Sequence, residues 1–282
     1  MRMSTSSLAF HTNINEIRVL PILEVKRETS TVKSIVFEDY PCSHANPGQY
    51  VMVWIPGVDE IPLSISLMGE NESCRVTVKK VGDATSALHK KTIGESIGVR
   101  GPYGNHFDLV KGNVIVVGGG TGIAPIIPLI QRLIQIGSDL TLIIGYKDSS
   151  ELLFYEEAMS LLQGKGKLLV TTEDGSRGLQ GFPTDILSEE ISTDSFDMVY
   201  TCGPELMMKK VFKISENNDV ELQASLERYI KCSIGVCGQC VLSPLGIRVC
   251  VEGPVLKSSI LRELDDFGVF SRNSSGKKIH LQ

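Results

Sequence analysis

Residues 114–125 read Val-Ile-Val-Val-Gly-Gly-Gly-Thr-Gly-Ile-Ala-Pro, and this stretch decides the fold of the second half of the chain. Its four consecutive β-branched residues predict a short strand that is buried on both faces, as the strands of parallel sheets are. The glycine-rich turn leads into an apolar run from Ala124 to Ile136, which predicts a helix that Gly137 closes. A strand, a tight turn and a helix in this order are typical of a doubly wound α/β domain.

The same turn is a candidate binding site. Glycines let the backbone come close to a pyrophosphate, and the free N–H groups and the dipole at the start of a helix stabilise its negative charge. The sequence therefore predicts dinucleotide binding by Gly119, Gly120, Thr121 and Gly122. Because the spacing is not G-x-G-x-x-G, tight packing of the turn without a ligand is the alternative.

Three further apolar runs follow the turn: Leu140–Ile144, Leu168–Thr172 and Met198–Thr201. Ligands of open α/β sheets bind at the carboxyl ends of the strands. Cys202, Gly203 and Pro204 come after the last of these strands, so we expect them beside a nicotinamide ring. For Cys202 alone, a small buried apolar residue is the alternative. Arg177 would suit the 2′-phosphate of NADP, whereas Asp148 points to NAD.

The first half of the chain has another pattern. From about Glu16 to Phe107, short segments rich in β-branched and aromatic residues are separated by Pro and Gly. This pattern is typical of antiparallel strands, and we expect a small antiparallel β-barrel there. The polar stretch from Met1 to Asn15 has no apolar centre, so we expect a loose extension and not a signal peptide.

Four cysteines in the last quarter of the chain have a spacing that carries chemistry. Cys232, Cys237, Cys240 and Cys250 are spaced C-x4-C-x2-C-x9-C, which matches the plant-ferredoxin kind of 2Fe-2S site. Glycines inside the loop leave room for backbone N–H groups to point at the cluster sulfides. Zinc is the alternative, although zinc sites usually have two C-x2-C pairs and only one is present.

Composition limits the classes of function. A net charge of −5 gives no support to nucleic-acid binding. The chain lacks a run of about 18 apolar residues, so we expect no membrane span. Its 282 residues and 42% hydrophobic content are ample for more than one core. Seven cysteines without a secretory signal suit a reducing compartment, and we expect a cytoplasmic protein.

Together these segments resemble the ferredoxin-reductase-like flavoprotein superfamily. The stretches 225–240 and 248–256 are similar to the electron-transfer subunits of type B dihydroorotate dehydrogenase, and the tail resembles the form of this family seen in archaea. The resemblance covers nearly all of the chain beyond its N-terminal extension. It implies an extension over 1–15, an FAD-binding β-barrel over 16–108, an NAD-binding α/β domain over 109–222 and a small 2Fe-2S region over 223–282.

The resemblance also implies a sequence of redox groups. In such enzymes a partner subunit oxidises dihydroorotate to orotate on its own FMN, and electrons pass through a 2Fe-2S cluster and FAD to NAD. The flavin stands between the other two because a cluster moves single electrons whereas nicotinamide accepts a hydride. The chain would have no catalytic residue of its own. It would work in de novo pyrimidine (UMP) biosynthesis, in a heterotetramer with two FMN-containing catalytic subunits.

Site residues follow by motif position. The resemblance implies cluster ligation by all four spaced cysteines. It implies FAD contacts in three segments of the barrel: Ile61, Pro62, Leu63 and Ser64; Thr77, Val78 and Lys79; Ala84 and Thr85. Within the family that the chain resembles, arginine usually stands where this chain has Ile61, and that arginine would pair with the FAD pyrophosphate. The charge must come from elsewhere here, and Lys79 or Lys80 would supply part of it.

Two other functions fit part of the pattern. A subunit of a ferredoxin:NADP oxidoreductase or of a soluble hydrogenase would carry the same cofactors with another partner, and Arg177 favours this alternative. A non-enzymatic redox sensor or zinc-binding adaptor would need only the cysteines. Flavin and iron-sulfur absorbance in the purified protein would exclude the sensor or adaptor.

Overall fold

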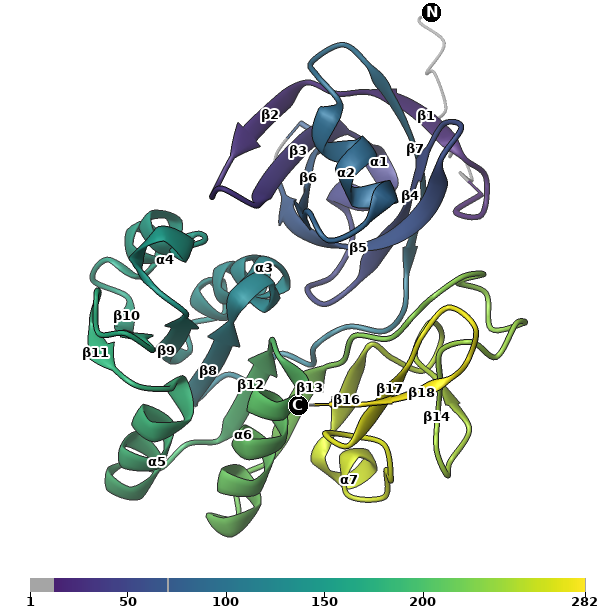
Figure 1. The fold of residues 1–282 in the computed structure, drawn as a ribbon. Helices are drawn as coiled ribbons and strands as arrows, with labels where there is room; N and C mark the ends of the chain where they lie inside the picture. The colour runs from purple at the N-terminus through teal and green to yellow at the C-terminus, as the bar shows by residue number, and fades with distance from the viewer. Residues whose placement is uncertain (1–12, 70, 282) are drawn as a thin grey trace, which may run out of the picture.

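Two large sheets carry the fold of the computed structural model, which describes residues 13–69 and 71–281 (Figure 1). The first is an antiparallel sheet that curls into a barrel. The second is a mostly parallel sheet with helices on both faces, followed by a C-terminal region of short elements. This arrangement confirms the expected fold class, an antiparallel barrel followed by a doubly wound α/β domain and a small appendage.

Seven strands form the barrel: β1 (Arg18–Pro21), β2 (Glu24–Arg27), β3 (Val32–Glu38), β4 (Tyr50–Ile55), β5 (Asp59–Met68), β6 (Ser73–Lys79) and β7 (Ser96–Tyr103). They pair in the order β1-β7-β4-β5-β6-β3-β2, always antiparallel. Alternate side chains, such as Ile35, Val53 and Val76, point into one apolar core. The short helix α1 (Tyr40–Ser43) and helix α2 (Asp83–Lys90) complete the barrel.

The second sheet has a point where its strand order reverses. Its parallel strands are β8 (Asn113–Gly119), β9 (Asp139–Tyr146), β10 (Gly166–Thr172), β11 (Leu179–Gln180), β12 (Met198–Cys202) and β13 (Leu222–Ser225). The order β11-β10-β9-β8-β12-β13-β16 places the first strand, β8, between β9 and β12. The chain leaves β8 and β12 in opposite directions. Open α/β sheets bind their ligands at such a point, beside the carboxyl ends of the two strands.

Helices cover both faces of this sheet: α3 (Ile123–Gln135), α4 (Tyr155–Leu162), α5 (Pro183–Thr193) and α6 (Glu205–Asn217), with the short turns η1 (Gly120–Gly122) and η2 (Ser149–Glu151). The expected helix after the glycine turn is confirmed, and Gly137 closes it with a φ of +77°. Helix α3 is apolar nearly all round because it packs against β5 of the barrel as well as against its own sheet. Within residues 13–69 and 71–281, none of the helices combines the length and apolar character needed to cross a bilayer.

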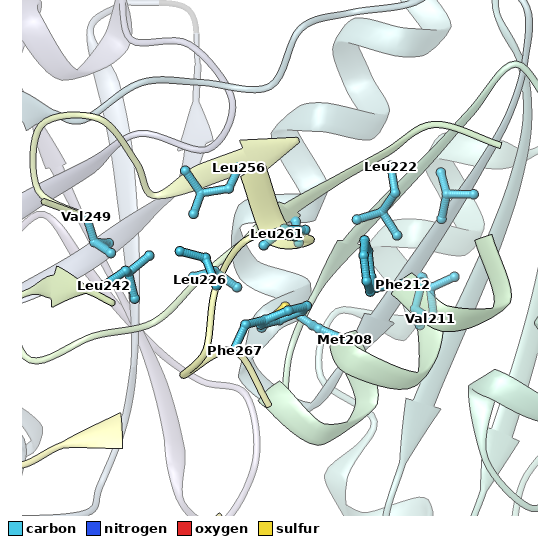
Figure 2. Packing of buried hydrophobic residues seen from close by; sticks show 14 of the residues in the cluster. Met208, Val211, Phe212, Leu222, Leu226, Leu242, Val249, Leu256, Leu261 and Phe267 are labelled. Atoms are coloured by element: carbon cyan, nitrogen blue, oxygen red, sulfur yellow. The ribbon is translucent and has the colours of Figure 1, made fainter. Parts of the chain in front are cut away.

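The C-terminal region shares a core with the α/β domain. Its elements are β14 (Val241–Leu242), β15 (Ile247–Arg248), β16 (Val255–Lys257), α7 (Ser258–Leu261), β17 (Phe270–Arg272) and β18 (Lys278–His280). Strand β16 pairs antiparallel with β13 and so ends the large sheet. Figure 2 shows Leu242 and Val249 packed in one apolar cluster with Phe267 and with Phe212 of α6. The loop that carries the cysteines is thus fixed to the α/β domain.

Candidate functional site

The four spaced cysteines come together in the loop that precedes β16. Cys240 and Cys250 are buried, Cys232 is partly buried and Cys237 is exposed. The thiols of Cys232 and Cys237 are neighbours, and so are the thiols of Cys240 and Cys250. The backbone N–H of Cys250 also donates to Cys240 Sγ at 3.4 Å. The structure therefore places the four predicted ligands in one loop as two pairs of neighbouring thiols.

The surroundings favour the thiolate form at Cys232 and disfavour it at Cys250. Burial raises the pKa of the Cys232 thiol, but backbone N–H groups, chiefly that of Cys237, more than offset this and bring the pKa to about 6. Burial and the neighbouring Cys240 raise the pKa of the Cys250 thiol to about 12. Thiolates this close repel one another, and positively charged iron removes that repulsion.

The loop has the backbone shape that an iron-sulfur cluster needs. Gly235 and Gly238 have φ values of +78° and +69°, in the left-handed region that favours glycine. A Cβ atom at Gly235 would lie 2.8 Å from the side chains of Arg248 and Val251. The Ser233 hydroxyl is buried in this loop beside the Tyr50 hydroxyl.

The pairing of the four cysteines matches the ligand division of a 2Fe-2S cluster. Among residues 13–69 and 71–281 the thiols stay in two pairs, and no three His, Cys, Asp or Glu side chains gather tightly enough to hold a single ion. A 2Fe-2S cluster takes two thiolates at each iron. The pairs Cys232 with Cys237 and Cys240 with Cys250 match that division.

Arg100 holds the cysteine loop against the barrel. Its guanidinium donates to the Glu60 carboxylate at 2.5 and 2.7 Å and to the carbonyl oxygen of Cys232 at 3.3 Å. Its Nη1 also donates to the Tyr103 hydroxyl at 3.2 Å. No sequence motif marks Arg100, because its partners Glu60 and Cys232 lie 40 and 132 positions away along the chain.

Asn105 makes a second connection between the barrel and the cysteine loop. Its amide donates to the carbonyl oxygens of Glu252 and Val255 at 2.8 and 2.7 Å, and its Oδ1 accepts the N–H of Val255 at 2.9 Å. All the hydrogen-bonding groups of this side chain except one lone pair are thus used by the segment that follows Cys250. His106, beside it, is exposed and bonds only locally, to the carbonyl oxygen of Phe107.

The two predicted dinucleotide segments meet at the point where the sheet order reverses. Gly122 lies so close to the loop after β12 that a Cβ atom there would be 2.4 Å from the Cα and N atoms of Gly203. Gly119 is similarly packed against Pro204 and Met207. Gly120, in contrast, has a φ of +52° and open space where a Cβ atom would be. The turn therefore leaves its backbone accessible to a ligand at Gly120.

Cys202 ends β12 next to this turn, in register with Gly118. The side chain is mostly buried, and burial raises the pKa of its thiol to about 12. The thiol is therefore neutral at physiological pH, and it offers a ligand a small uncharged surface and no nucleophile.

The polar loops after β9 and β10 lie together at the carboxyl edge of the sheet. The backbone N–H of Ser149 donates to the Ser176 hydroxyl at 2.8 Å. Asp148 accepts hydrogen bonds from Ser150, which lower the pKa of its carboxyl. Arg177 is exposed, and its guanidinium donates to the Tyr155 hydroxyl at 2.9 Å. Asp148, which points to NAD, and Arg177, which would suit NADP, thus lie at the same carboxyl edge of the sheet.

The predicted flavin segments lie on β5, β6 and the start of α2. Ile61 and Leu63 of β5 are partly buried and pack against the barrel core. Ala84 of α2 is also partly buried and packs against this core. Ser64 is partly exposed, as is Pro62, and Lys79 is exposed. Except for Lys79, the side chains of these residues are partly covered by other residues of the barrel.

Two other predicted flavin contacts are buried, and a third caps a helix. Val78 is 1% exposed, and the Thr77 hydroxyl bonds to those of Ser34 and Ser66 at 3.1 and 2.9 Å. The Thr85 hydroxyl accepts the N–H groups of Val81 and Gly82, both at 2.9 Å. It therefore shapes the turn that opens α2.

The barrel and the dinucleotide turn face each other, which is the arrangement that a flavin-to-nicotinamide transfer requires. Helix α3 packs against β5, and η1 lies beside β6. Gly82, at the start of α2, has open space where a Cβ atom would be, as Gly120 has. Backbone N–H groups at a helix start and at a glycine turn are suited to phosphate groups, so these residues fit FAD and NAD.

One ion pair ties the two domains together across this boundary. Arg75 of β6 donates two hydrogen bonds of 2.9 Å to Glu157 of α4, and its guanidinium lies over the Phe154 ring at 4.4 Å. Arg75 also donates to the hydroxyl and carbonyl oxygens of Ser66 at 3.1 and 2.9 Å. No sequence motif marks this residue, because its partners come from another domain.

Family models match two parts of the chain. The oxidoreductase NAD-binding domain matches residues 116–213, and the iron-sulfur cluster binding domain of dihydroorotate dehydrogenase B matches residues 227–262. The second match contains all four cysteines.

Curated relatives match almost the whole chain. A probable dihydroorotate dehydrogenase B (NAD(+)), electron transfer subunit, from Methanocaldococcus jannaschii is 40% identical over 260 residues, 92% of this chain and 96% of that protein. Proteins of the same description from Methanocella arvoryzae and Thermoplasma acidophilum are 40% and 34% identical, over 91% and 92% of this chain and 96% of each of those proteins.

Solved structures share the fold. An NADH-dependent reduced ferredoxin-NADP oxidoreductase is 29% identical, with a TM-score of 0.79 over 87% of this chain and 89% of that chain. The FAD/NAD-binding domain of a nitric oxide dioxygenase from Vibrio cholerae is 22% identical, with a TM-score of 0.62 over 72% of this chain and 94% of that chain, and shares the fold alone.

Proposed function

Since this chain belongs to the family of dihydroorotate dehydrogenase B electron-transfer subunits, we propose that it carries electrons from dihydroorotate to NAD. Dihydroorotate would be oxidised on the FMN of a catalytic partner subunit, and this chain would contribute a 2Fe-2S cluster and FAD. The reaction would serve de novo pyrimidine (UMP) biosynthesis. We further propose a heterotetramer of two chains of each kind and a cytoplasmic location, which seven free thiols support.

The observation that carries this proposal is the position of the four cysteines. They form two neighbouring pairs in a loop that Arg100 and Asn105 connect to the barrel. On its other side the loop is open, because Cys237 is exposed and Ile234 and Val236 are 51% and 78% exposed. Exposed apolar side chains around a redox ligand suit contact with a protein partner.

Each group of residues has a defined task in this proposal. When bound, a 2Fe-2S cluster exchanges single electrons, FAD exchanges one or two, and NAD accepts a hydride. Cys232, Cys237, Cys240 and Cys250 would hold the cluster. The three barrel segments would hold FAD. The turn Gly119–Gly122 would bind the NAD pyrophosphate, while the loop Cys202–Pro204 would contact the nicotinamide.

A second candidate function has one observation in its favour. The similar solved structure is a ferredoxin-NADP oxidoreductase, and Arg177 is exposed at the sheet edge where a 2′-phosphate would bind. A chain of this kind would carry the same FAD and cluster but exchange electrons with a ferredoxin. We prefer NAD because Asp148 lies at the same edge, where a carboxylate would repel that phosphate.

Analysis of the purified protein tests the proposal. We expect about one FAD and two iron atoms per chain, and co-purification with the FMN-containing subunit when both are produced together. A colourless protein that contains zinc would contradict it. Electron exchange with reduced ferredoxin, without any response to dihydroorotate in the complex, would favour the second candidate.

A further inference from the structure

A cationic cavity of about 420 Å³ lies between the β2–β3 hairpin and helix α2. Four cationic side chains contribute to its lining: Arg27 of β2, Lys33 of β3, Lys80 after β6 and Lys90 at the end of α2. No carboxylate is among the described residues that line it. The cavity therefore has a strongly positive surface in a protein whose net charge is −5.

These four charges are not neutralised within the chain. None of them forms an ion pair with another described residue. The lysines just outside the cavity do: Lys26 pairs with Glu28 at 3.0 Å and Lys91 with Glu95 at 3.1 Å. Cations of the same sign around one cavity repel each other unless an anion binds between them.

Hydrogen bonds to backbone carbonyl oxygens help to hold two of the charges in place. Lys33 Nζ donates to the carbonyl oxygen of His89 at 2.7 Å, and Arg27 Nε donates to that of Thr29 at 3.3 Å. The donors of Arg27 other than Nε, and the remaining protons of Lys33, have no described partner and are available to a ligand. Hydroxyl groups of Ser30 and Ser86 lie in the same lining. Cationic side chains and hydroxyl groups together can donate hydrogen bonds to the oxygens of a phosphate group.

The cavity continues from the predicted flavin segments. Lys80 follows Lys79 at the end of β6, and Ser86 follows Thr85 in the first turn of α2. The Lys80 N–H donates to the carbonyl oxygen of Thr31 at 2.9 Å, which joins the end of β6 to the β2–β3 hairpin. The cavity therefore borders the segments that contain Lys79 and Thr85.

The predicted flavin strand β5 supplies no positive charge at Ile61, which packs partly buried against the barrel core. We propose that the cationic cavity binds the diphosphate-bearing adenosine half of FAD, with Arg27, Lys33 and Lys80 supplying positive charge to its phosphates. This inference rests on the proposed function, since it requires that the chain binds FAD.

Flavin affinities of the flavin-free, full-length protein test this inference. Riboflavin has the same ring system as FAD but lacks its phosphates and adenosine. In the Lys33→Gln/Lys80→Gln variant we expect the FAD dissociation constant to rise by up to about tenfold, because each exposed charge pair contributes a factor of at most about five. The riboflavin dissociation constant should stay unchanged. ADP should displace FAD, but not riboflavin, from the wild type.

Matched controls keep the result specific. The Lys26→Gln/Lys91→Gln variant removes two lysines that flank the cavity but do not line it, and it should bind FAD like the wild type. Arg27→Gln, at an exposed position of β2, repeats the test without touching α2 and should also weaken FAD alone.

Four outcomes would overturn the inference. An unchanged FAD constant in both cavity variants, or an equal rise in cavity and control variants, would contradict it while flavin binding, and so the proposed function, remains intact. ADP that binds without displacing FAD would assign the cavity to a free nucleotide. A wild type that binds no flavin would contradict the proposed function itself.

Discussion

Arg100 and Glu60 form a two-pronged ion pair, with hydrogen bonds of 2.5 and 2.7 Å, at the base of the cysteine loop. Glu60 lies on β5 directly before Ile61, and the same guanidinium donates to the carbonyl oxygen of Cys232 at 3.3 Å. Both side chains are mostly buried, at 14% and 22% exposed. The pair therefore connects the predicted flavin strand to the first predicted cluster ligand and fixes the spacing between them.

Arg100→Gln should loosen the cysteine loop. The variant loses the ion pair and the bond to Cys232, and leaving charged groups unpaired in a partly buried place costs about 1–3 kcal/mol. We expect the variant to lose iron to a chelator faster than the wild type, with its FAD content unchanged. Visible absorbance measures the loss of iron. Arg262→Gln is the control, because its guanidinium pairs with the more exposed Glu216 of α6 and makes no hydrogen bond to the described part of the cysteine loop. Equal iron loss in both variants would contradict the role of Arg100.

Gly122→Ala should damage the dinucleotide site alone. The new Cβ atom would meet the backbone of Gly203 at 2.4 Å, and backbone on both sides leaves little room to adjust. We expect NADH affinity to fall on the order of tenfold or more, since small displacements at a site have large effects on binding and rate. Titration with NADH measures the loss, and FAD and iron contents serve as internal controls. Wild-type NADH affinity would place the dinucleotide elsewhere.

Glu157→Gln should weaken the tie between the barrel and the α/β domain. It leaves the Arg75 guanidinium, 9% exposed, without its carboxylate, at a cost of about 1–3 kcal/mol. We expect the melting temperature to fall by a few degrees and NADH-to-dye reduction to slow. Glu156→Gln, at the neighbouring exposed position, should change neither. Identical melting of the two variants would show that the pair does not hold the domains.

Cys237→Ser should abolish the iron-sulfur cluster and leave the flavin site intact. Losing the exposed ligand removes one of the two thiolates from its iron, so the cluster should not assemble. We expect loss of the iron-sulfur absorbance and of electron exchange with the partner subunit, while NADH-to-dye reduction through FAD stays near the wild-type rate. Loss of both activities together would argue against separate sites.

Sequence patterns predicted the parts of this protein that depend on local chemistry. The buried strand before the glycine turn, the helix α3 and the spacing of the four cysteines each follow from neighbouring residues, and the structure has all of them. Residues 1–12 of the expected extension over 1–15 lie outside the described residues.

Long-range contacts could not be predicted in the same way. Strand β16 is only three residues long, and it is a strand because it pairs with β13, about 30 residues earlier. Arg75 and Arg100 stand in no motif, and their partners lie on other elements. The pairing of the predicted FAD residues with a cationic cavity likewise needs the hairpin β2–β3 to fold back on α2.

The most direct test of the proposed function is dihydroorotate-dependent reduction of NAD by the purified complex of this chain with its FMN-containing partner. We expect NADH to form only when both subunits are present, and to form at a strongly reduced rate when this chain carries Cys237→Ser. A complex with FAD, FMN and iron in place that reduces a dye with NADH, yet produces no NADH from dihydroorotate, would contradict the assignment.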